Sequence, residues 1–394
     1  MKQNVVVLFG GVSVEHDISI ITGSQVLANL DRKKNNIIPI YISKDGRFLT
    51  DENFWDVTYF AKEQNFSKAR QVFFASEGNL FYTKGKKAKL LCKVDFAYVA
   101  LHGGMGESGS VQGLLDCVGI KYSCCDNFSS SVCMNKFCTK ILAKEQKIPV
   151  AKGILLSYED KNISASCLME KIEGLNYPIV VKPNNLGSSI GITFCKDEEM
   201  LHGAVTFAFL FDTEVLCEEA ICNLRELNIA CLGAGKMCEC SLVEEVTPNE
   251  DFLTFENKYL GGGKAMESQK RIVPASVSKK ILNRIEIYAR RMFCAVKMKG
   301  CVRMDFLMDE KTETIYLNEV NPIPGSLANY LWENKGYTFQ NLLEKMKDYA
   351  EIDYEEKGKK ITQFSSSVLQ NFSCIEGNKF GKYLITKIGD GVFC

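Results

Sequence analysis

The first 130 residues alternate between short apolar runs of strand length and stretches with helical periodicity, and no other feature of the chain restricts its fold as strongly. Helical patterns follow Asp17 and surround Val111. The strand-like runs are Val5–Phe9, Ile37–Ile42, Phe96–Leu101 and Ile120–Cys125. Strands that alternate with helices pair in parallel and are covered by those helices. We therefore predict an α/β fold with a parallel N-terminal sheet.

A different pattern begins near residue 130. Ser129–Ser131 precede apolar positions that recur at helical spacing, which predicts a capped amphipathic helix. Its apolar positions are Met134, Phe137, Cys138, Ile141 and Leu142, with Lys136 and Lys140 off the stripe. The stretch that follows is typical of a mostly antiparallel sheet with helices on one side. Its strands are Tyr177–Lys182, Glu214–Glu218, Glu226–Leu232 and Ser241–Val246.

A predicted hairpin closes the part of the chain that shows clear patterning. Its strands are Arg303–Met308 and Thr314–Val320, joined around Asp309–Lys311. A chain of 394 residues allows two or three domains. We predict a parallel α/β domain at 1–130, a central subdomain at 131–215, a C-terminal subdomain at 216–350, and an extension of unassigned role at 351–394.

Charge and cysteine content narrow the function classes. The chain has 48 Lys and Arg against 48 Asp and Glu, so no net field attracts nucleic acid or anionic lipid. No run approaches the roughly 18 apolar residues of a membrane helix, and no signal-peptide pattern is present. The 17 cysteines of so long a chain therefore indicate a reducing cytoplasm. The closest cysteine pairs, such as Cys238 and Cys240, lack zinc-site spacing, so we expect buried free thiols.

One glycine-rich loop admits a cofactor interpretation. Gly104, Gly106 and Gly109 fit the Gly-x-Gly-x-x-Gly pattern between a strand and a helix, and Asp126 lies about 20 residues on. This interpretation would make the chain a nicotinamide-dependent oxidoreductase. A tight strand-to-helix turn is the commoner meaning of the motif alone. The chain lacks a P-loop sequence, so any nucleotide must be held in another way.

The C-terminal hairpin carries the strongest constellation. Glu319 and Asn321 are two residues apart on one strand and therefore face the same side, and Asp305 can oppose them from the neighbouring strand. Three oxygen ligands suit Mg²⁺, with Mn²⁺ as the alternative, because such ions take their other ligands from water and substrate phosphates. A hairpin with charged residues on its solvated side is the competing interpretation.

A second constellation is suited to phosphate. Lys182 ends an apolar strand and is followed by the small-residue loop Gly187–Gly191, whose N–H groups and neighbouring charge can hold phosphate oxygens. Glu218 and Glu219 end one strand and Glu226 begins the next, which offers backbone contacts to a base and a carboxylate for ribose. Exposed acidic residues beside a turn are the commoner explanation of such a pattern.

Taken in order, these motifs resemble the signatures of the D-alanine:D-alanine ligases of the ATP-grasp group. The resemblance runs from Val5 to about Leu331. The matching segments are Gly10–Ser19, Leu101–Gly109 with Gln112–Gly113, Val181–Pro183 with Gly187–Ser189, Asn257–Tyr259, Arg303–Asp305, and Asn318–Asn321 with Pro324–Gly325. The resemblance implies an ATP-grasp fold behind an N-terminal Rossmann-like parallel α/β domain.

The resemblance also implies a reaction. ATP would convert the first D-alanine into an acyl phosphate, and the amine of the second D-alanine would attack it to give D-alanyl-D-alanine for peptidoglycan synthesis. The implied ligands are ATP, D-alanine and Mg²⁺ or Mn²⁺, and the implied form is a cytoplasmic homodimer.

The resemblance assigns roles to residues of this sequence. Glu15 and His102 would contact the first substrate, and Arg303 with the N–H of Gly325 would meet the oxyanion. The implied nucleotide contacts are Lys136, Lys182, Glu218, Glu219, Ile221, Glu226 and Lys258, and the implied metal ligands are Asp305, Glu319 and Asn321. Tyr259 would close with its loop onto Ser188 and Glu15 as a lid that excludes water.

The second substrate depends on one departure from the family pattern. Tyr330 falls where many members place a serine that binds the carboxylate of the second D-alanine. A phenol here would narrow the pocket and favour D-alanine, while Ser326, four residues earlier on an expected helix, would supply the hydroxyl. Leu331 completes the expected substrate contacts. D-alanine:D-serine and D-alanine:D-lactate ligation are the alternatives.

Overall fold

The computed structural model describes residues 2–61, 66–247, 270–362 and 365. The chain divides into a compact unit, Met1–Asp353, and a second unit, Tyr354–Cys394. The boundaries expected at residues 130, 215 and 350 stay predictions. Among the described residues, no helix is long and apolar enough to cross a membrane.

The N-terminal sheet has the strand order β6-β5-β4-β3-β2-β1-β7. Strand β1 (Gln3–Gly10), next to the edge strand, pairs in parallel with β2 (Asn35–Ile42) and β7 (Phe96–Val99), as the alternating pattern predicts. The remaining strands pair antiparallel and extend one edge; they are β3 (Phe48–Thr50), β4 (Arg70–Ala75), β5 (Asn79–Lys84) and β6 (Lys87–Lys93). The sheet is therefore mixed.

The strand predicted at Ile120–Cys125 was wrong. Only Tyr122 forms a bridge, to Ala97, and the Ser123 side chain, in place of a backbone carbonyl, accepts the N–H of Val99 at 3.2 Å. The predicted helices are present as α1 (His16–Asn29) and α3 (Ser110–Val118), and the stretch taken as a glycine-rich loop contains a further short helix, α2 (Gly104–Glu107). Short 3-10 helices fill the connections at η1 (Glu52–Trp55), η2 (Val57–Ala61), η3 (Phe66–Lys68) and η4 (Ser76–Gly78).

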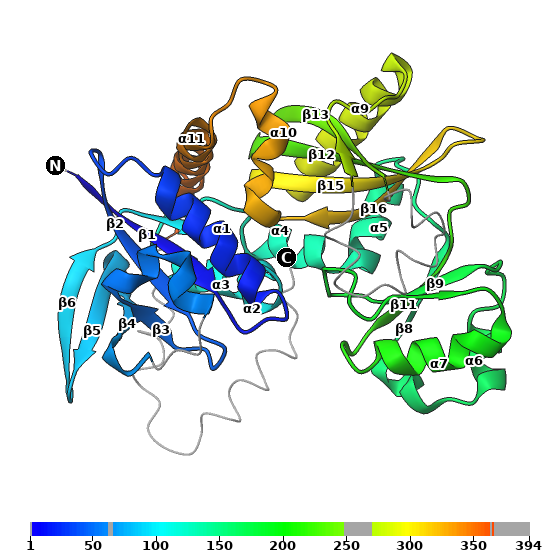
Figure 1. Cartoon of the computed structure of the whole chain (residues 1–394), viewed down its shortest axis with the longest axis horizontal. Helices are drawn as coiled ribbons and strands as arrows, with labels where there is room; N and C mark the ends of the chain where they lie inside the picture. The colour runs from blue at the N-terminus through cyan, green and yellow to red at the C-terminus, as the bar shows by residue number, and fades with distance from the viewer. Residues whose placement is uncertain (1, 62–65, 248–269, 363–364, 366–394) are drawn as a thin grey trace. The chain divides into compact units, whose positions relative to one another are not determined.

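The strand-rich middle forms two antiparallel sheets, where the sequence suggested one. The first has the order β10-β9-β11-β8 and packs against α7 (Glu198–Ala208), next to α6 (Ala165–Lys171) (Figure 1). Its strands are β8 (Gly153–Leu156), β9 (Ile179–Pro183), β10 (Thr193–Cys195) and β11 (Val215–Glu219), and η5 (Tyr158–Asn162) follows β8.

The second antiparallel sheet has the order β14-β13-β12-β15-β16, and α9 (Lys279–Val296) packs on β12 and β13. Its strands are β12 (Leu224–Ala234), β13 (Met237–Thr247), β14 (Lys270–Ile272), β15 (Lys299–Asp309) and β16 (Thr314–Asn321). The predicted C-terminal hairpin is confirmed, because β15 and β16 pair antiparallel with Asp305 opposite Glu319.

The single capped helix expected after Ser129–Ser131 was wrong. The structure has two helices, α4 (Asn127–Met134), capped by Asp126, and α5 (Lys136–Glu145), capped by Asn135. The side-chain Oδ1 of Asn135 accepts the N–H of Cys138 at 2.8 Å. The expected apolar stripe is only partly buried, since Leu142 packs against a buried cluster but Ile141 is 51% exposed. Instead α5 buries Lys136 and Lys140, because this helix faces a set of acidic groups.

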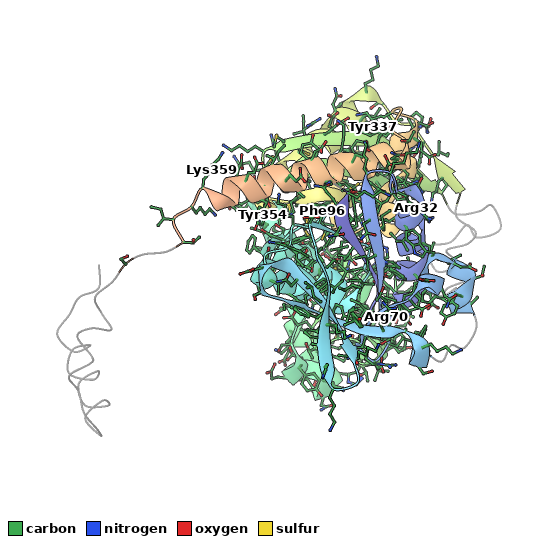
Figure 2. The ribbon with its side chains drawn as sticks, turned by 90° about the vertical axis from the view of Figure 1, so that its left-hand side faces the viewer. Arg32, Arg70, Phe96, Tyr337, Tyr354 and Lys359 are labelled. Carbon is green, nitrogen blue, oxygen red and sulfur yellow. The ribbon has the colours of Figure 1, made fainter. Side chains whose placement is uncertain are left out.

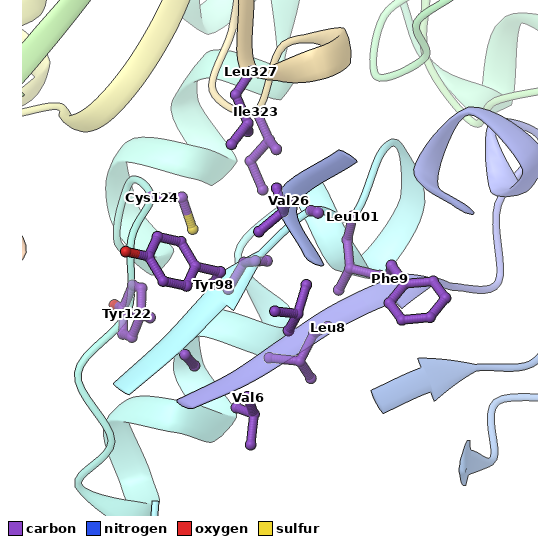
Figure 3. Packing of buried hydrophobic residues seen from close by; sticks show 14 of the residues in the cluster. Val6, Leu8, Phe9, Val26, Tyr98, Leu101, Tyr122, Cys124, Ile323 and Leu327 are labelled. Carbon is purple, nitrogen blue, oxygen red and sulfur yellow. The ribbon is translucent and has the colours of Figure 1, made fainter. Parts of the chain in front are cut away.

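Segments from both ends of the compact unit share one core. Ile323 and Leu327, which follow β16, pack in one cluster with Val26 and Leu101 (Figure 3). These C-terminal elements are η7 (Gly325–Ala328), α10 (Tyr330–Glu333) and α11 (Phe339–Gly358). On α11 the Lys347 Nζ lies 5.9 Å from the ring centre of Phe96, which Figure 2 shows beside that helix. The C-terminal segment thus completes the N-terminal core.

Candidate active site

The β15–β16 hairpin brings the three predicted metal ligands together. Asp305 and Glu319 are cross-strand partners, and the Asn321 amide nitrogen donates to Asp305 Oδ2 at 3.0 Å. Arg303, two residues before Asp305, grips the same carboxylate through Nε and Nη2, each at 2.7 Å. The alternation of strand side chains therefore places an acidic pair and an amide on one side, as the sequence indicated.

The two carboxylates titrate differently because their neighbours differ. Burial raises the pKa of Asp305 to about 6 despite its pairing with Arg303. For Glu319 burial acts in the same direction, but the charges of Lys136, Lys182 and Arg303 prevail and lower its pKa to about 2. Glu319 is therefore ionised at neutral pH, while Asp305 needs a second cation to be fully ionised in mildly acidic solution.

Two lysines lie close to the hairpin that carries these acids. Lys136 is on α5, and Lys182 is on β9 of the other antiparallel sheet. Lys136 Nζ lies 3.3 Å from Glu319 Oε2, and Lys182 Nζ lies 3.2 Å from Asn318 Oδ1. Glu218, at the end of β11, lies between two lysines: its Oε1 is 2.7 Å from Lys140 Nζ, and its Oε2 is 2.5 Å from Lys182 Nζ. All three lysines are buried. A buried positive region therefore faces the acidic hairpin.

Lys140 is a functional candidate that the sequence reasoning missed. Burial lowers its pKa to about 8 although Glu218 opposes that shift. The sequence did contain a signal for Lys140, because Lys136 and Lys140 are four residues apart and share one helix face. The sequence reasoning placed both lysines off the apolar stripe and assigned a nucleotide contact to Lys136 alone.

Glu15 sits beside two glycine-rich loops. Ser188 Oγ donates to Glu15 Oε1, while Oε2 is buried with no hydrogen-bond partner among the described residues. A Cβ added to Gly103 would lie 2.5 Å from Oε2, and one added to Gly187 would lie 3.0 Å from Oε1. Burial raises the pKa of Glu15. A cation beside Oε2 would relieve this unfavourable burial.

Close packing explains why glycines occur in the Gly104–Gly109 loop. A Cβ on Gly104 would approach the Val12 carbonyl oxygen to 2.6 Å, and one on Gly106 would approach Leu101 Cβ to 2.3 Å. These contacts account for the motif without a dinucleotide.

His102 connects three segments of the chain. Burial lowers its pKa to about 4, so the ring is neutral at pH 7. Its Nδ1 is 2.8 Å from the carbonyl oxygen of Ile323, so that nitrogen carries the proton and donates. Its Nε2 then accepts from Thr22 Oγ1 at 2.7 Å, and Thr22 Oγ1 accepts the N–H of Ser326 at 3.0 Å. His102 therefore holds α1 against the segment that contains Gly325.

Glu107 makes a parallel connection that the sequence reasoning did not assign. Its Oε2 accepts the N–H of Gly103 at 2.8 Å, and its Oε1 accepts the N–H of Ile323 at 3.2 Å. Burial, with the charge of Glu15, raises the pKa of Glu107 to about 8. Because Ile323 lies more than 200 residues along the chain, no local pattern could reveal this contact.

The expected helix face shared by Ser326 and Tyr330 was wrong. Ser326, Leu327 and Ala328 have positive φ angles of 51°, 50° and 50°, so Tyr330 begins a separate helix, α10. Its hydroxyl donates to Glu244 Oε1 at 2.8 Å.

Tyr330 also has one cationic neighbour, Arg271, and one apolar neighbour, Leu331. The Arg271 guanidinium lies 4.7 Å from the centre of the Tyr330 ring. The Leu331 side chain is fully buried in the core, so only its backbone remains for the substrate contact expected there. Glu244, which sequence reasoning did not assign, and Arg271 thus fix the phenol.

The remaining predicted residues have the following positions. Glu219 Oε1 accepts the N–H of Asn176 at 3.0 Å, and Ile221 and Glu226 are half-buried around the β11–β12 connection. A Cβ on Gly325 would meet open space. Lys258 and Tyr259, with the lid expected there, lie outside the described residues.

The arrangement suits transfer chemistry on anionic groups. Two carboxylates and an amide are the hard oxygen donors that Mg²⁺ uses, and three lysines with Arg303 can neutralise phosphate charge. Glu15 adds a buried carboxylate for a substrate cation.

Comparison with known proteins agrees with the family resemblance found in the sequence. A family model described as "D-ala D-ala ligase N-terminus" matches residues 4–125, and one described as "D-ala D-ala ligase C-terminus" matches residues 142–348. The D-alanine–D-alanine ligase of Thermosipho melanesiensis is 38% identical over 370 residues, covering 93% of this chain and 98% of the relative. That of Caldicellulosiruptor bescii is 36% identical over 358 residues, covering 88% and 94%.

Solved structures with the same fold agree. The VanG D-Ala:D-Ser ligase of Enterococcus faecalis has a TM-score of 0.76 at 28% identity, covering 89% of this chain and all of that one. The D-alanine–D-alanine ligase of Coxiella burnetii has a TM-score of 0.76 at 26% identity, covering 91% and 96%. The expected ATP-grasp fold is thereby confirmed.

A substitution at Gly103 tests the tight space around Glu15. An alanine Cβ would lie 2.4 Å from Ser13 Oγ and 2.5 Å from Glu15 Oε2. Gly85 is the control, because its φ of 62° matches the 63° of Gly103 and nothing lies within 4 Å of its Cβ. We expect Gly103→Ala to lower the free energy of unfolding in urea by about 1–3 kcal/mol more than Gly85→Ala. Equal losses would contradict the packing described.

A substitution at Glu218 tests the buried charge cluster. Glu218→Gln leaves two buried lysines without their shared anion, which we expect to cost about 3–5 kcal/mol of unfolding free energy at pH 7. Glu219→Gln, at a partly exposed neighbour outside the cluster, is the control.

The pH dependence of that loss has a definite sign. In the variant the pKa of Lys140, already about 8, falls further, while the unfolded chain keeps the ordinary value of 10.5. The unfolded state then binds more protons, so the free energy of unfolding rises with pH in this range. Urea unfolding should show a smaller deficit at pH 9 than at pH 7, and a deficit that grows would refute the explanation.

Proposed function

The chain belongs to the D-alanine–D-alanine ligase family, and from this premise we propose how its residues carry out the reaction. The family joins two D-alanines with ATP for peptidoglycan synthesis, and the present chain is such an ATP-dependent ligase. The observation that carries the residue assignments is the meeting of the Asp305–Glu319 pair with Lys136 and Lys182.

The first step activates a carboxylate. A carboxylate is a poor electrophile, so the γ-phosphoryl group of ATP is transferred to it to give an acyl phosphate, a reaction that depends on positioning and charge neutralisation. Lys136 and Lys182 contact the phosphates and exchange their present partners Glu319 and Asn318 for them. Mg²⁺, held by Asp305, Glu319 and Asn321, supplies further charge neutralisation when bound. The Asn321 amide must turn its oxygen towards the ion, since its nitrogen now donates to Asp305.

Glu15 and the oxyanion groups act on the amino acids. The free Oε2 of Glu15 receives the ammonium group of the first D-alanine, and Ser188 keeps the carboxylate in place. When the amine of the second D-alanine attacks the acyl phosphate, charge grows on the carbonyl oxygen, where Arg303 and the Gly325 N–H donate. The C–O bond to phosphate then breaks, and phosphate leaves as the amine loses a proton and the amide bond forms. Asp305 fixes the Arg303 guanidinium through two hydrogen bonds.

D-Alanine is the proposed second substrate. The Tyr330 ring is held by Glu244 and Arg271 and limits the room for a larger acceptor. The D-alanine:D-serine specificity of the Enterococcus faecalis neighbour belongs to that protein. The choice of Mg²⁺ over Mn²⁺, a homodimer, and a cytoplasmic location are further parts of the proposal.

The metal assignment is tested by Glu319→Gln. The variant keeps its shape but loses the charge at the metal site, so ADP release that depends on both D-alanine and Mg²⁺ should fall by at least about 100-fold. Glu313→Gln on the same hairpin, where Glu313 pairs with the exposed Lys280 at 3.2 Å, is the control and should retain activity. Near-normal turnover in the Glu319 variant, with a normal circular dichroism spectrum, would exclude the assigned ligand.

Ser326 and Tyr330 share no helix face, but the Ser326 hydroxyl stays our proposed contact to the carboxylate of the second D-alanine. Ser326→Ala tests this contact. Loss of one hydrogen bond to a carboxylate costs about 1.5–3 kcal/mol, so the KM for the second D-alanine should rise about ten- to a hundredfold. The KM for ATP serves as the internal control and should not change. D-Serine and D-lactate should be poorer acceptors than D-alanine for the unmodified enzyme. Unaltered kinetics would reject the role of Ser326, and a preference for D-serine or D-lactate would reject the specificity.

A further inference from the structure

Three cysteine thiols converge on the β12–β13 hairpin. Cys231 on β12 is the cross-strand partner of Cys240 on β13, and Cys238 lies two residues before Cys240 on the same strand. The sulfur atoms of all three lie within 4.8 Å of one another, and the Cys231 and Cys240 sulfurs are 3.8 Å apart. Because alternate residues of a strand share a face and cross-strand partners do so as well, the pairing itself brings the three thiols together.

The spacing of the sulfurs is that of thiolates around one metal ion. A zinc–thiolate bond is about 2.3 Å long, so two sulfurs on a tetrahedral zinc lie about 3.8 Å apart. A disulfide would require the same two sulfurs to approach to about 2.05 Å. We propose that Cys231, Cys238 and Cys240 form a second metal site, which binds a thiophilic cation of the Zn²⁺ class through three sulfurs.

The surroundings of the thiols suit a bound cation. Cys231 and Cys240 are buried, whereas Cys238 is half-buried, which leaves one ligand within reach of solvent. Arg290 on α9 donates to the Cys238 carbonyl oxygen, and Glu286 holds the Arg290 side chain at 2.7 Å. Three thiolates on a divalent ion leave one net negative charge, and the Arg290 guanidinium stands beside the cluster to balance it.

The thiol cluster is separate from the active site. Cys231 and Cys240 belong to the core between the sheet and α9, together with Ile285. Asn228 and Glu244, on the same two strands, hydrogen-bond to each other at 3.2 Å, and Glu244 accepts the hydroxyl of Tyr330 at the proposed second-substrate site. The two sites also differ in chemistry, because soft thiolates select Zn²⁺ and related ions while the hard oxygens of the other site suit Mg²⁺.

The ligand set explains why spacing along the chain did not reveal the site. A Cys-x-Cys pair supplies only two ligands and lacks the usual zinc pattern. The third ligand comes from the neighbouring strand, and only the pairing of Cys231 with Cys240 makes it adjacent. Cysteine packing as small apolar groups, which the sequence favoured, accounts for burial but not for the meeting of three sulfurs.

Cadmium titration of the full chain tests the site, because Cd²⁺ bound by thiolates gives an ultraviolet charge-transfer band that oxygen ligands do not give. The titration is done in a thiol-free reductant with Mg²⁺ in excess, so that the oxygen site is occupied. We expect the band to saturate at one equivalent, and Zn²⁺ to displace Cd²⁺ and to be retained at one equivalent after dialysis. Cys231 is the cross-strand partner of Val302 and shares the core next to α9 with it, whereas Arg303 points to the other face of β15. The rate of D-alanyl-D-alanine synthesis by Cys238→Ser should therefore match that of the unmodified enzyme.

Matched variants identify the ligands. Cys238→Ser changes a half-buried thiol and should fold, and we expect its Cd²⁺ affinity to fall at least about 100-fold. Cys167→Ser removes an exposed thiol on α6 and should bind as the unmodified chain does. A wild-type chain that shows no saturating band, or a Cys238 variant with unchanged affinity, would overturn the proposal. A Cys231–Cys240 disulfide found by mass spectrometry in the same reductant would overturn it as well.

Discussion

The pairing of Glu218 with Lys140 and Lys182 is the interaction on which the active site depends most. An isolated charge in a protein interior is expensive, so buried lysines require an anion at hydrogen-bond distance. That anion stands on β11, while the lysines come from α5 and β9. The positions of a helix and two strands are thereby tied to one carboxylate. Lys136 extends the same arrangement to Glu319 on the hairpin of the second antiparallel sheet.

A second set of contacts joins the two ends of the compact unit. His102 and Glu107, both beside the N-terminal sheet, hydrogen-bond to the backbone of Ile323. Ile323 in turn leads to Gly325 and Ser326, which the proposed mechanism uses. The loop that carries Gly103 also lies close to Glu15. The same loop therefore helps to position both the Glu15 carboxylate and the segment that contains Gly325. His102 and Glu107 therefore act as positioning residues for groups that would touch substrate.

Sequence reasoning succeeded where the chemistry follows a local period. The hairpin, with Asp305 opposite Glu319, follows from two-residue alternation. It failed where a partner distant in the sequence decides which helix face is buried. The buried face of α5 carries Lys136 and Lys140, because their anionic partners lie elsewhere in the chain. It also failed at Ser326, because three consecutive residues with positive φ are not a pattern that residue types reveal. The family signatures identified the reaction, whereas the groups that hold the site in place, such as Glu107, became visible only in the structure.

The shared core has a consequence for biosynthesis. Leu101 belongs to the N-terminal half, yet it packs in one cluster with Ile323, which a ribosome adds 222 residues later. At about 5–20 residues per second, that interval lasts about 10 to 45 seconds. During this time the nascent N-terminal sheet must keep an apolar surface unpaired. The N-terminal core is therefore completed only after most of the chain has been translated.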